Sequence, residues 1–280
     1  MIADGLALRY TLTRAGALAC RSYLRMWEQG MPRRATSPSS PSAEPDLATM
    51  RPVQQPALLA APVASEPPLR RCGLDEVGRG ALAGPLVAAA VILPDDIAER
   101  LGALARFLRD SKTVPRARRE DLADAIRVHA LAVEMVVIGV EEINQQGIGW
   151  ANREAFRRLI AALDADEYIV DGRVRPPAPP DRMARVRCLV KADTLVPAVA
   201  AASLVAKVYR DGLMAALHGD YPAFGWRENA GYGTAAHLAA LRLVGVCPEH
   251  RTLFVTTALS GGQRARKRGH NAAEPQRLLE

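Results

Sequence analysis

Apolar runs separated by glycine, proline or charged residues divide most of the chain into segments of strand or helix length. The clearest case is residues 69–94, where an apolar run reaches two adjacent carboxylates, breaks at Gly78 and Gly80, and resumes as a second run rich in alanine and valine. Short apolar runs with glycine between them are typical of strands joined by a turn. We therefore predict a strand, a turn and a strand that are too apolar to lie at the surface.

Helical spacing and short apolar runs alternate through the rest of the chain. Apolar residues recur every three or four positions, which predicts helices, over 97–108, 116–130, 150–164, 197–219 and 237–244. Apolar runs of strand length lie at 131–139, 167–172 and 186–193, and a short polar connection lies at 141–149. Strands that alternate with helices indicate an α/β fold.

Acidic residues lie at the carboxyl ends of three of the predicted strands. They are Asp75 and Glu76 in the first strand, Asp171 in the strand at 167–172, and Asp193 in the strand at 186–193. Open α/β sheets bind ligands at the carboxyl ends of their strands, so the four acids are candidates for one site. Since side chains alternate faces along a strand, Asp75 and Glu76 share a site only if the strand curls there. The alternatives are solvated acids of a surface hairpin and, for Asp171 and Asp193, helix caps.

The chemistry of this acid set indicates a metal site. Oxygen ligands without histidine or cysteine select hard cations such as Mg²⁺ or Mn²⁺. Two such ions would activate water, orient a scissile phosphate and stabilise the leaving oxygen, so no covalent nucleophile is needed. Without metal, four carboxylates at one point repel one another, which raises the pKa of at least one of them.

Two turns are candidates for binding the substrate. Gly78 and Gly80 leave backbone N–H groups accessible to a ligand, and Arg79 between them supplies a positive charge. The polar turn at Ser111 and Lys112 either holds a phosphate or is an ordinary loop, and composition favours neither interpretation.

Other polar residues are open to two interpretations each. Tyr232, between two glycines, either lays its ring against a sugar or base or is a core tyrosine. On the predicted helix at 197–219, Lys207, Arg210 and Asp211 could reach a substrate, although most charges on such a helix are solvated.

Composition separates a central domain from two tails. Nine of the twenty prolines precede residue 69, so we expect residues 1–68 to be a disordered extension with no part in the chemistry. We expect residues 69–258 to form the catalytic domain and 259–280 a basic, flexible tail that adds non-specific phosphate affinity. Of the net charge of +7, the extension carries +2 and residues 260–280 carry +3, which leaves +2 for the body.

The sequence predicts a cytoplasmic monomer without a membrane span. No apolar run is long enough to cross a bilayer. A transit peptide is open, although Asp4 and Glu28 count against it, and Met31 and Met50 are possible later starts. Four scattered cysteines show no zinc-binding spacing and suit a reducing compartment as small core residues.

Four motifs in order resemble one family. GLDEVGRGALAGPLVAAAVIL, VDG, KADTLVPAVAAASLVAKVYRD and GYGTAAHLAALR resemble bacterial ribonuclease HII, the type 2 ribonuclease H, over roughly residues 69–256. The resemblance implies a ribonuclease H-like fold, with a central mixed β-sheet flanked by helices and a helical C-terminal part. It also implies hydrolysis of the RNA strand in RNA–DNA hybrids, and incision on the 5′ side of single ribonucleotides in duplex DNA, leaving 3′-hydroxyl and 5′-phosphate ends. Such a nuclease would serve ribonucleotide excision repair.

The same resemblance assigns roles to residues. The catalytic acids, which would also hold Mn²⁺ or Mg²⁺, fall on Asp75, Glu76, Asp171 and Asp193. The family's glycine-arginine-glycine run, which grips the ribonucleotide and its 2′-hydroxyl, falls on Gly78, Arg79 and Gly80. The tyrosine that packs on the neighbouring deoxyribose falls on Tyr232. The implied partners are RNA–DNA hybrid and duplex DNA that contains ribonucleotides.

The chain departs from the family pattern at three places. Ala230 replaces the usual lysine, Leu253 replaces a serine, and 176–182 is an insertion; these affect phosphate affinity and loop shape. The related type 3 enzymes carry a folded N-terminal domain and a glutamate as fourth acid, so the proline-rich extension and Asp193 favour type 2. Two rival functions are an RNA–DNA hybrid-binding protein that does not cut, and a two-metal DNA nuclease on the same fold. All four acids count against the first, and Tyr232 with the glycine-arginine-glycine run counts against the second.

Overall fold

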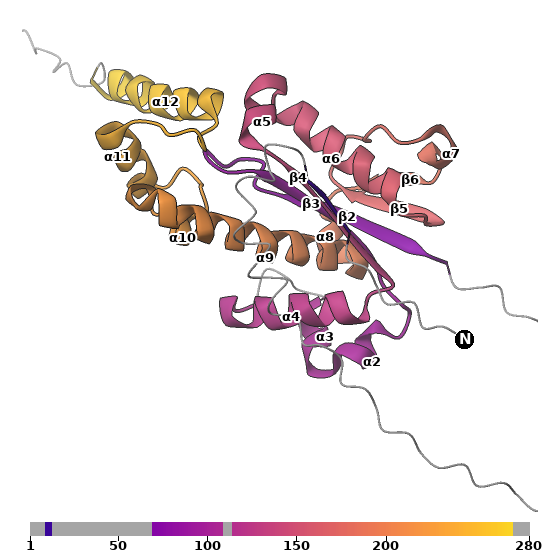
Figure 1. Cartoon of the computed structure of the whole chain (residues 1–280). Helices are drawn as coiled ribbons and strands as arrows, with labels where there is room; N and C mark the ends of the chain where they lie inside the picture. The colour runs from indigo at the N-terminus through magenta and orange to yellow at the C-terminus, as the bar shows by residue number, and fades with distance from the viewer. Residues whose placement is uncertain (1–8, 13–68, 109–113, 271–280) are drawn as a thin grey trace, which may run out of the picture.

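A computed structural model of the chain describes residues 9–12, 69–108 and 114–270 (Figure 1). Within these residues the strands form one six-stranded sheet in the order β1-β4-β3-β2-β5-β6. The strands are β1 (Arg9–Leu12), β2 (Arg71–Val77), β3 (Leu86–Ile92), β4 (Ala132–Ile138), β5 (Glu167–Asp171) and β6 (Val186–Leu189). The pairs β2–β3 and β3–β4 are antiparallel, and β1–β4, β2–β5 and β5–β6 are parallel. The predicted α/β fold with a central mixed sheet is therefore confirmed.

Helices cover both faces of this sheet (Figure 1). On one face lie α5 (Val140–Gln146) and α6 (Ile148–Ala162), and on the other lie α4 (Arg116–His129) and the long α9 (Pro197–Asp220). Short helices follow β3, namely α2 (Ile97–Leu101), a 3₁₀ turn (Gly102–Leu104) and α3 (Ala105–Leu108). The loops after β5 and β6 contain α7 (Pro180–Met183) and α8 (Ala192–Leu195).

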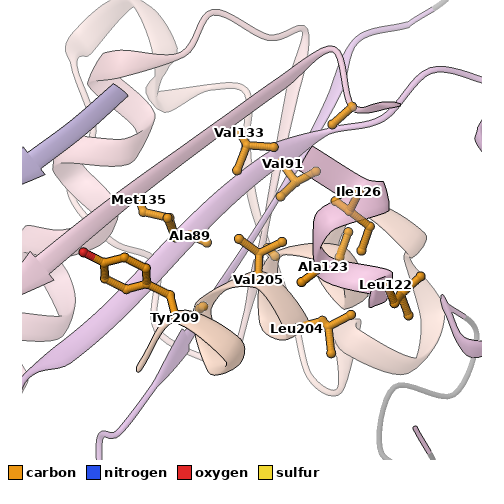
Figure 2. Close-up of a cluster of buried hydrophobic side chains, with 14 of the residues drawn as sticks. Ala89, Val91, Leu122, Ala123, Ile126, Val133, Met135, Leu204, Val205 and Tyr209 are labelled. Atoms are coloured by element: carbon orange, nitrogen blue, oxygen red, sulfur yellow. The ribbon is translucent and has the colours of Figure 1, made fainter. Parts of the chain in front are cut away.

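The side chains of β3 alternate between the two cores. Ala89 and Val91 pack with α4 and α9, as Figure 2 shows, whereas Ala88 and Ala90 pack with α6. This is the alternation that a strand imposes when both of its faces are buried. Each residue of β2 points to the same face of the sheet as the β3 residue opposite it. The face of each acid in β2 therefore follows from its partner in β3.

A third core lies under the C-terminal helices. These are a 3₁₀ turn (Pro222–Phe224), α10 (Trp226–Asn229), α11 (Ala235–Val244) and α12 (Thr252–His270). Their apolar side chains pack with Leu82 and Ala83 of the loop between β2 and β3 and with Met214 of α9. This third core supports the inner side of the β2–β3 loop, and its helices confirm the predicted helical C-terminal part.

Several boundaries differ from the prediction for local reasons. The helix predicted over 97–108 is broken at Gly102, which takes a φ of +52°. The polar connection at 141–149 contains α5, which Glu142 stabilises by accepting a hydrogen bond from the N–H of Gly139 at its start. The strand predicted over 186–193 ends at Leu189, because Lys191 is left-handed with a φ of +59° and α8 follows.

The tails also differ from the expectation within the described residues. Arg9–Leu12, from the segment expected to be disordered, pairs with β4 as an edge strand. Helix α12 continues to His270, past the predicted boundary at 258; the good helix formers QRARKR at 263–268 lie within this extension, although three glycines flank them. The division into a catalytic domain and two tails stays a prediction. No helix among the described residues has the length and hydropathy needed to cross a membrane.

Helix α9 lies unusually close to β2, at Gly73. A Cβ atom on this glycine would come within 2.2 Å of the backbone carbonyl carbon of Ala198 and the backbone nitrogen of Val199. We expect Gly73→Ala to lower the free energy of unfolding by at least about 1–3 kcal/mol, because backbone atoms cannot move aside singly. Denaturant unfolding measures this change.

Gly219→Ala is the matched control for that measurement. Gly219 lies near the C-terminal end of α9, and a Cβ there would meet no atom within 4 Å. The control is expected to change the free energy of unfolding by at most about 1 kcal/mol, and in the stabilising direction. Equal unfolding midpoints for Gly73→Ala and the wild type would contradict the close packing of α9 on β2.

Candidate active site

Asp75 and Glu76 lie in β2 before its last residue, and their side chains take opposite faces of the sheet. Asp75 is paired with Ala89, on the face covered by α9, and Glu76 with Ala88, on the face covered by α6. The pairing continues to Val77, so the curl expected at the two acids is absent. Both acids nevertheless interact electrostatically with Asp171, because β5 runs parallel beside β2. The neighbouring strand brings the charges together, and the curl is not needed.

The carboxyl group of Asp75 is held in an unfavourable environment for a charge. Only 7% of the residue is exposed, and burial is the main cause that raises its pKa from 3.8 to about 7. A hydrogen bond from Ser203 of α9 acts in the opposite direction, and the charges of Glu76 and Asp171 raise the pKa further. Asp75 Oδ1 also accepts the backbone N–H of Glu76 at 2.8 Å.

Two neighbouring groups partly offset the effect of burial on the pKa of Glu76. Burial raises its pKa, Arg79 lowers it, and the side chain of Asn152 in α6 lowers it as well. Arg79 Nη1 lies 3.6 Å from Glu76 Oε1, while 62% of the Arg79 side chain stays exposed. The buried Nδ2 of Asn152 has no partner at hydrogen-bond distance among the described residues, so its contact with Glu76 is looser than a full hydrogen bond.

Asp171 joins the end of β5 to the segment that carries Asp193. Its Oδ1 accepts the backbone N–H of Ala192 at 2.7 Å, at the start of α8. Asp193 is the next residue and is almost fully buried. Asp171 thus takes part in holding a helix start, as the alternative interpretation expected, and also belongs to the acidic group through its charge.

The four acids offer oxygen ligands but no preformed metal cage. Within the described part of the chain, no group of three or more histidine, cysteine, aspartate or glutamate side chains has the compact arrangement of a metal site. In both Asp75 and Asp171, Oδ1 accepts a backbone N–H, which orients the carboxylate. Since mutual repulsion contributes to the raised pKa of Asp75, a bound cation would relieve it. The donor chemistry therefore fits a hard cation.

The turn after β2 is held tightly at Gly78 and left open at Gly80. Gly78 has a φ of +87°, and a Cβ there would come within 2.1 Å of Arg210 Nε. At Gly80 a Cβ would meet nothing within 4 Å. The N–H groups of Arg79 and Gly80 donate no hydrogen bond to any described residue. This open edge, next to the acids, is where a ligand can approach the backbone.

Tyr232 lies beside this turn because the two loops are hydrogen-bonded. The carbonyl of Gly231 accepts the N–H of Leu82 at 2.8 Å and that of Ala83 at 3.2 Å. Tyr232 is 37% exposed, and its ring centroid lies 5.5 Å from Arg210 Cζ. The core-tyrosine alternative is therefore wrong, and the ring is available to a ligand.

A buried histidine pair fixes the segment of Tyr232. His237 Nδ1 lies 2.9 Å from the carbonyl oxygen of Tyr232, Trp226 Nε1 donates to His237 Nε2 at 3.2 Å, and His250 Nε2 lies 3.1 Å from the same atom. A carbonyl oxygen only accepts, so His237 carries its proton on Nδ1. Burial lowers the pKa of both histidines, that of His250 to about 4, and keeps them neutral.

The other candidates separate into three groups. Ser111 and Lys112 lie outside the described residues. Lys207 and Asp211 form an ion pair at 3.0 Å on α9. Arg210 is fully buried, so neither substrate contact nor solvation describes it.

The structure also reveals residues that the sequence analysis missed. They are Asn152, Ser203, His237, His250 and Arg251, which support the acids or the two loops. Local sequence gave no signal for them, because a charged or polar residue is usually exposed and its burial depends on distant segments.

The chain is similar to known proteins over most of its length. A family described as Ribonuclease HII matches residues 72–257. Ribonuclease HII of Acidovorax sp. (strain JS42) is 46% identical over 194 residues, covering 69% of this chain and 88% of that protein. Ribonuclease HII of Paramagnetospirillum magneticum (strain ATCC 700264 / AMB-1) is 47% identical over 189 residues, covering 67% and 90% respectively.

Solved structures agree with these matches. The RNase HII of Archaeoglobus fulgidus, solved in a complex with PCNA, is 29% identical with a TM-score of 0.55, over 65% of this chain and 94% of that one. Bst-RNase HIII, solved in complex with Mn²⁺, shares the fold at a TM-score of 0.52 and 21% identity, over 70% of this chain and 71% of that one. Sequence and fold lead to the same conclusion, which the motifs had predicted: the chain belongs to the ribonuclease HII family.

Proposed function

We propose that this protein is a metal-dependent endonuclease that hydrolyses the RNA strand of RNA–DNA hybrids and cuts duplex DNA on the 5′ side of an embedded ribonucleotide. The observation that carries the proposal is the meeting of Asp75, Glu76 and Asp171 beside a turn with open backbone N–H groups. Membership of the ribonuclease HII family supports it. The products would carry 3′-hydroxyl and 5′-phosphate ends, as ribonucleotide excision repair requires.

Substrate choice would depend on the turn and on Tyr232. The 2′-hydroxyl is what distinguishes RNA from DNA at a given site. The N–H groups of Arg79 and Gly80 can donate to its oxygen, and the open space at Gly80 admits the ribose. Tyr232 would lie against the neighbouring deoxyribose, and the exposed charge of Arg79 would attract a phosphate.

The four acids Asp75, Glu76, Asp171 and Asp193 would hold the metal ions. When bound, two hard cations would supply an activated water and would stabilise the leaving oxygen. Asp75 must be ionised to act as a ligand, so metal affinity should rise as pH passes its pKa of about 7. Ser203 orients Asp75 from one face of the sheet, and Asn152 adjoins Glu76 on the other.

The choice between Mg²⁺ and Mn²⁺ is part of the proposal. Both ions accept oxygen ligands, and Mn²⁺ is the ion named for the related RNase HIII structure. We further propose that the protein acts as a monomer in the cytoplasm. Its described cysteines, Cys72, Cys188 and Cys247, are free thiols, as suits a reducing compartment.

One assay separates this proposal from its two rivals. A duplex with a single ribonucleotide and an all-DNA duplex of the same sequence are incubated with Mg²⁺, with Mn²⁺ and with chelator. Cleavage of the first duplex alone, and only with metal, is expected. Binding without cleavage would favour the hybrid-binding protein, and cleavage of both duplexes would favour the DNA nuclease.

Asp171→Asn is expected to keep substrate binding and lose cleavage. The asparagine Oδ1 can still accept the Ala192 N–H, so the local structure is preserved, while a charged oxygen ligand is lost. We expect the cleavage rate to fall about 100-fold or more, with the dissociation constant for hybrid almost unchanged. Single-turnover cleavage and fluorescence anisotropy measure the two quantities. A variant with near wild-type rate would remove Asp171 from the site.

Gly80→Ala is expected to weaken substrate binding without weakening the fold. The new methyl group meets no protein atom within 4 Å, but it would occupy the space proposed for the ribose. The unfolding midpoint should stay constant, while KM for the ribonucleotide duplex should rise about tenfold. Unchanged kinetics would show that no substrate group lies against this glycine.

Asp75→Asn is expected to stabilise the metal-free protein at pH 8. The unfolded chain ionises Asp75 near its ordinary pKa of 3.8 and the folded protein near 7, so the free energy of unfolding falls as pH rises between these values. Asparagine removes this loss, which is on the order of a few kcal/mol because one pKa unit is about 1.4 kcal/mol.

The control for that measurement is Asp95→Asn, at an exposed position. Thermal unfolding with chelator present should show the gain for Asp75→Asn at pH 8, little gain at about pH 3, below both pKa values, where both states hold the proton, and no such pattern for the control. A loss of stability at pH 8 would contradict the assigned burial of this charge.

A further inference from the structure

Two arginine side chains lie fully buried beneath the β2–β3 loop. Arg210 comes from α9 and Arg251 from the residue before α12, and both are 0% exposed. Neither forms an ion pair with any described carboxylate. Burial lowers the pKa of both guanidinium groups, that of Arg251 to about 9, with the charge of Arg210 as the second cause for Arg251.

Among the described residues, these guanidinium groups donate hydrogen bonds to backbone carbonyl oxygens alone. Arg251 donates from Nη1 to Gly78 at 2.7 Å and to Arg79 at 3.2 Å, and from Nε and Nη2 to Gly84 at 2.9 and 2.8 Å. Arg210 donates to Pro85 at 2.9 Å, Ala83 at 3.1 Å and Ala230 at 2.8 Å. The pair therefore holds the loop 78–85 from inside, and Arg210 ties it to the segment that carries Tyr232.

The planarity of the peptide bond gives this arrangement a consequence for the outer side of the loop. In a trans peptide the C=O and the next N–H point in opposite directions. Because the carbonyls of Gly78 and Arg79 face Arg251 inside, the N–H groups of Arg79 and Gly80 face outward. These are the two N–H groups that have no partner among the described residues.

Burial of two charges without a carboxylate partner is costly even after the surroundings relax. The carbonyl dipoles offset part of this cost, and their orientation is fixed in return. A neutral core would satisfy packing but would leave these peptides free to rotate. The arrangement thus matches a loop whose donors must be aimed before the ligand arrives.

We propose that Arg251, assisted by Arg210, is a positioning residue for ribonucleotide recognition. By holding the carbonyls of Gly78 and Arg79 inward, it presents the N–H groups of Arg79 and Gly80 to the ribose 2′-oxygen. This inference rests on the proposed function, since it assigns the cause of selectivity for a ribonucleotide at the same site. Arg251 itself touches no substrate.

Arg251→Lys tests the proposal because it keeps a cation and loses the planar fork. Dissociation constants are measured, with chelator present, for a duplex with one ribonucleotide and for the all-DNA duplex of the same sequence. We expect the preference for the ribonucleotide duplex to fall about tenfold or more, with affinity for all-DNA duplex nearly constant. A merely structural role would weaken both affinities alike.

Arg182→Lys is the matched control. Arg182 also donates to backbone carbonyls, those of Ile160 and of Leu163 at 2.7 Å, but these lie at the end of α6 and after it, outside the loop. It should keep the wild-type preference. A folded Arg251→Lys protein with the wild-type preference would overturn the inference.

A second measurement avoids dependence on the stability of the variant. In the wild-type protein, the NMR signals of the Arg79 and Gly80 amides should move more on addition of the ribonucleotide duplex than of the all-DNA duplex. Equal shifts would overturn the inference even if Arg251→Lys fails to fold. A wild-type protein without preference for the ribonucleotide duplex would contradict the proposed function itself. A wild-type preference that Arg251→Lys leaves unchanged would contradict only the role of Arg251, so the two outcomes are distinguishable.

Discussion

The close packing of α9 against β2 is the constraint on which the rest of the structure depends. Gly73 allows the helix backbone to approach the strand at a distance that no side chain would permit. At that distance the alanine-rich face of α9 closes one core, and Ser203 reaches Asp75. Two turns further along the same helix, Arg210 lies under the loop that follows β2. One helix therefore supports both Asp75 and the loop 78–85, which fixes their relative position.

The candidate site combines two groups of buried charges of opposite sign. Carboxylates gather at the ends of β2 and β5, where burial and mutual repulsion raise the pKa of Asp75. Guanidinium groups lie beneath the neighbouring loop, where their hydrogen bonds go to backbone carbonyl oxygens. Such an arrangement suits a phosphodiester with metal ions, because the cations complete the acidic group and the backbone donors meet the polyanion. Each group is unfavourable alone, and the proposed complex relieves the acidic one.

The tertiary context explains where local prediction was incomplete. Asp75 and Glu76 alternate across the sheet as strand geometry demands, yet both act with Asp171 because a parallel strand lies alongside. Glu142 and Gly102 determined the limits of α5 and α2 through capping and backbone freedom, signals that are weak in a single sequence. The extra strand at Arg9–Leu12 pairs with a segment more than a hundred residues away, which no local pattern can show.

The sequence by itself determined the α/β class and the family, and it predicted the four acids and the glycine-flanked arginine as one site, because each is expressed in local periodicity or in a short motif. Only the tertiary structure decided that Tyr232 is exposed, that Arg210 and Arg251 are buried cations, and that a histidine pair anchors the tyrosine segment. The physical reason is that the environment of a polar side chain is set by segments distant along the chain. An arginine in a helix looks solvated until the loop that it holds is placed over it.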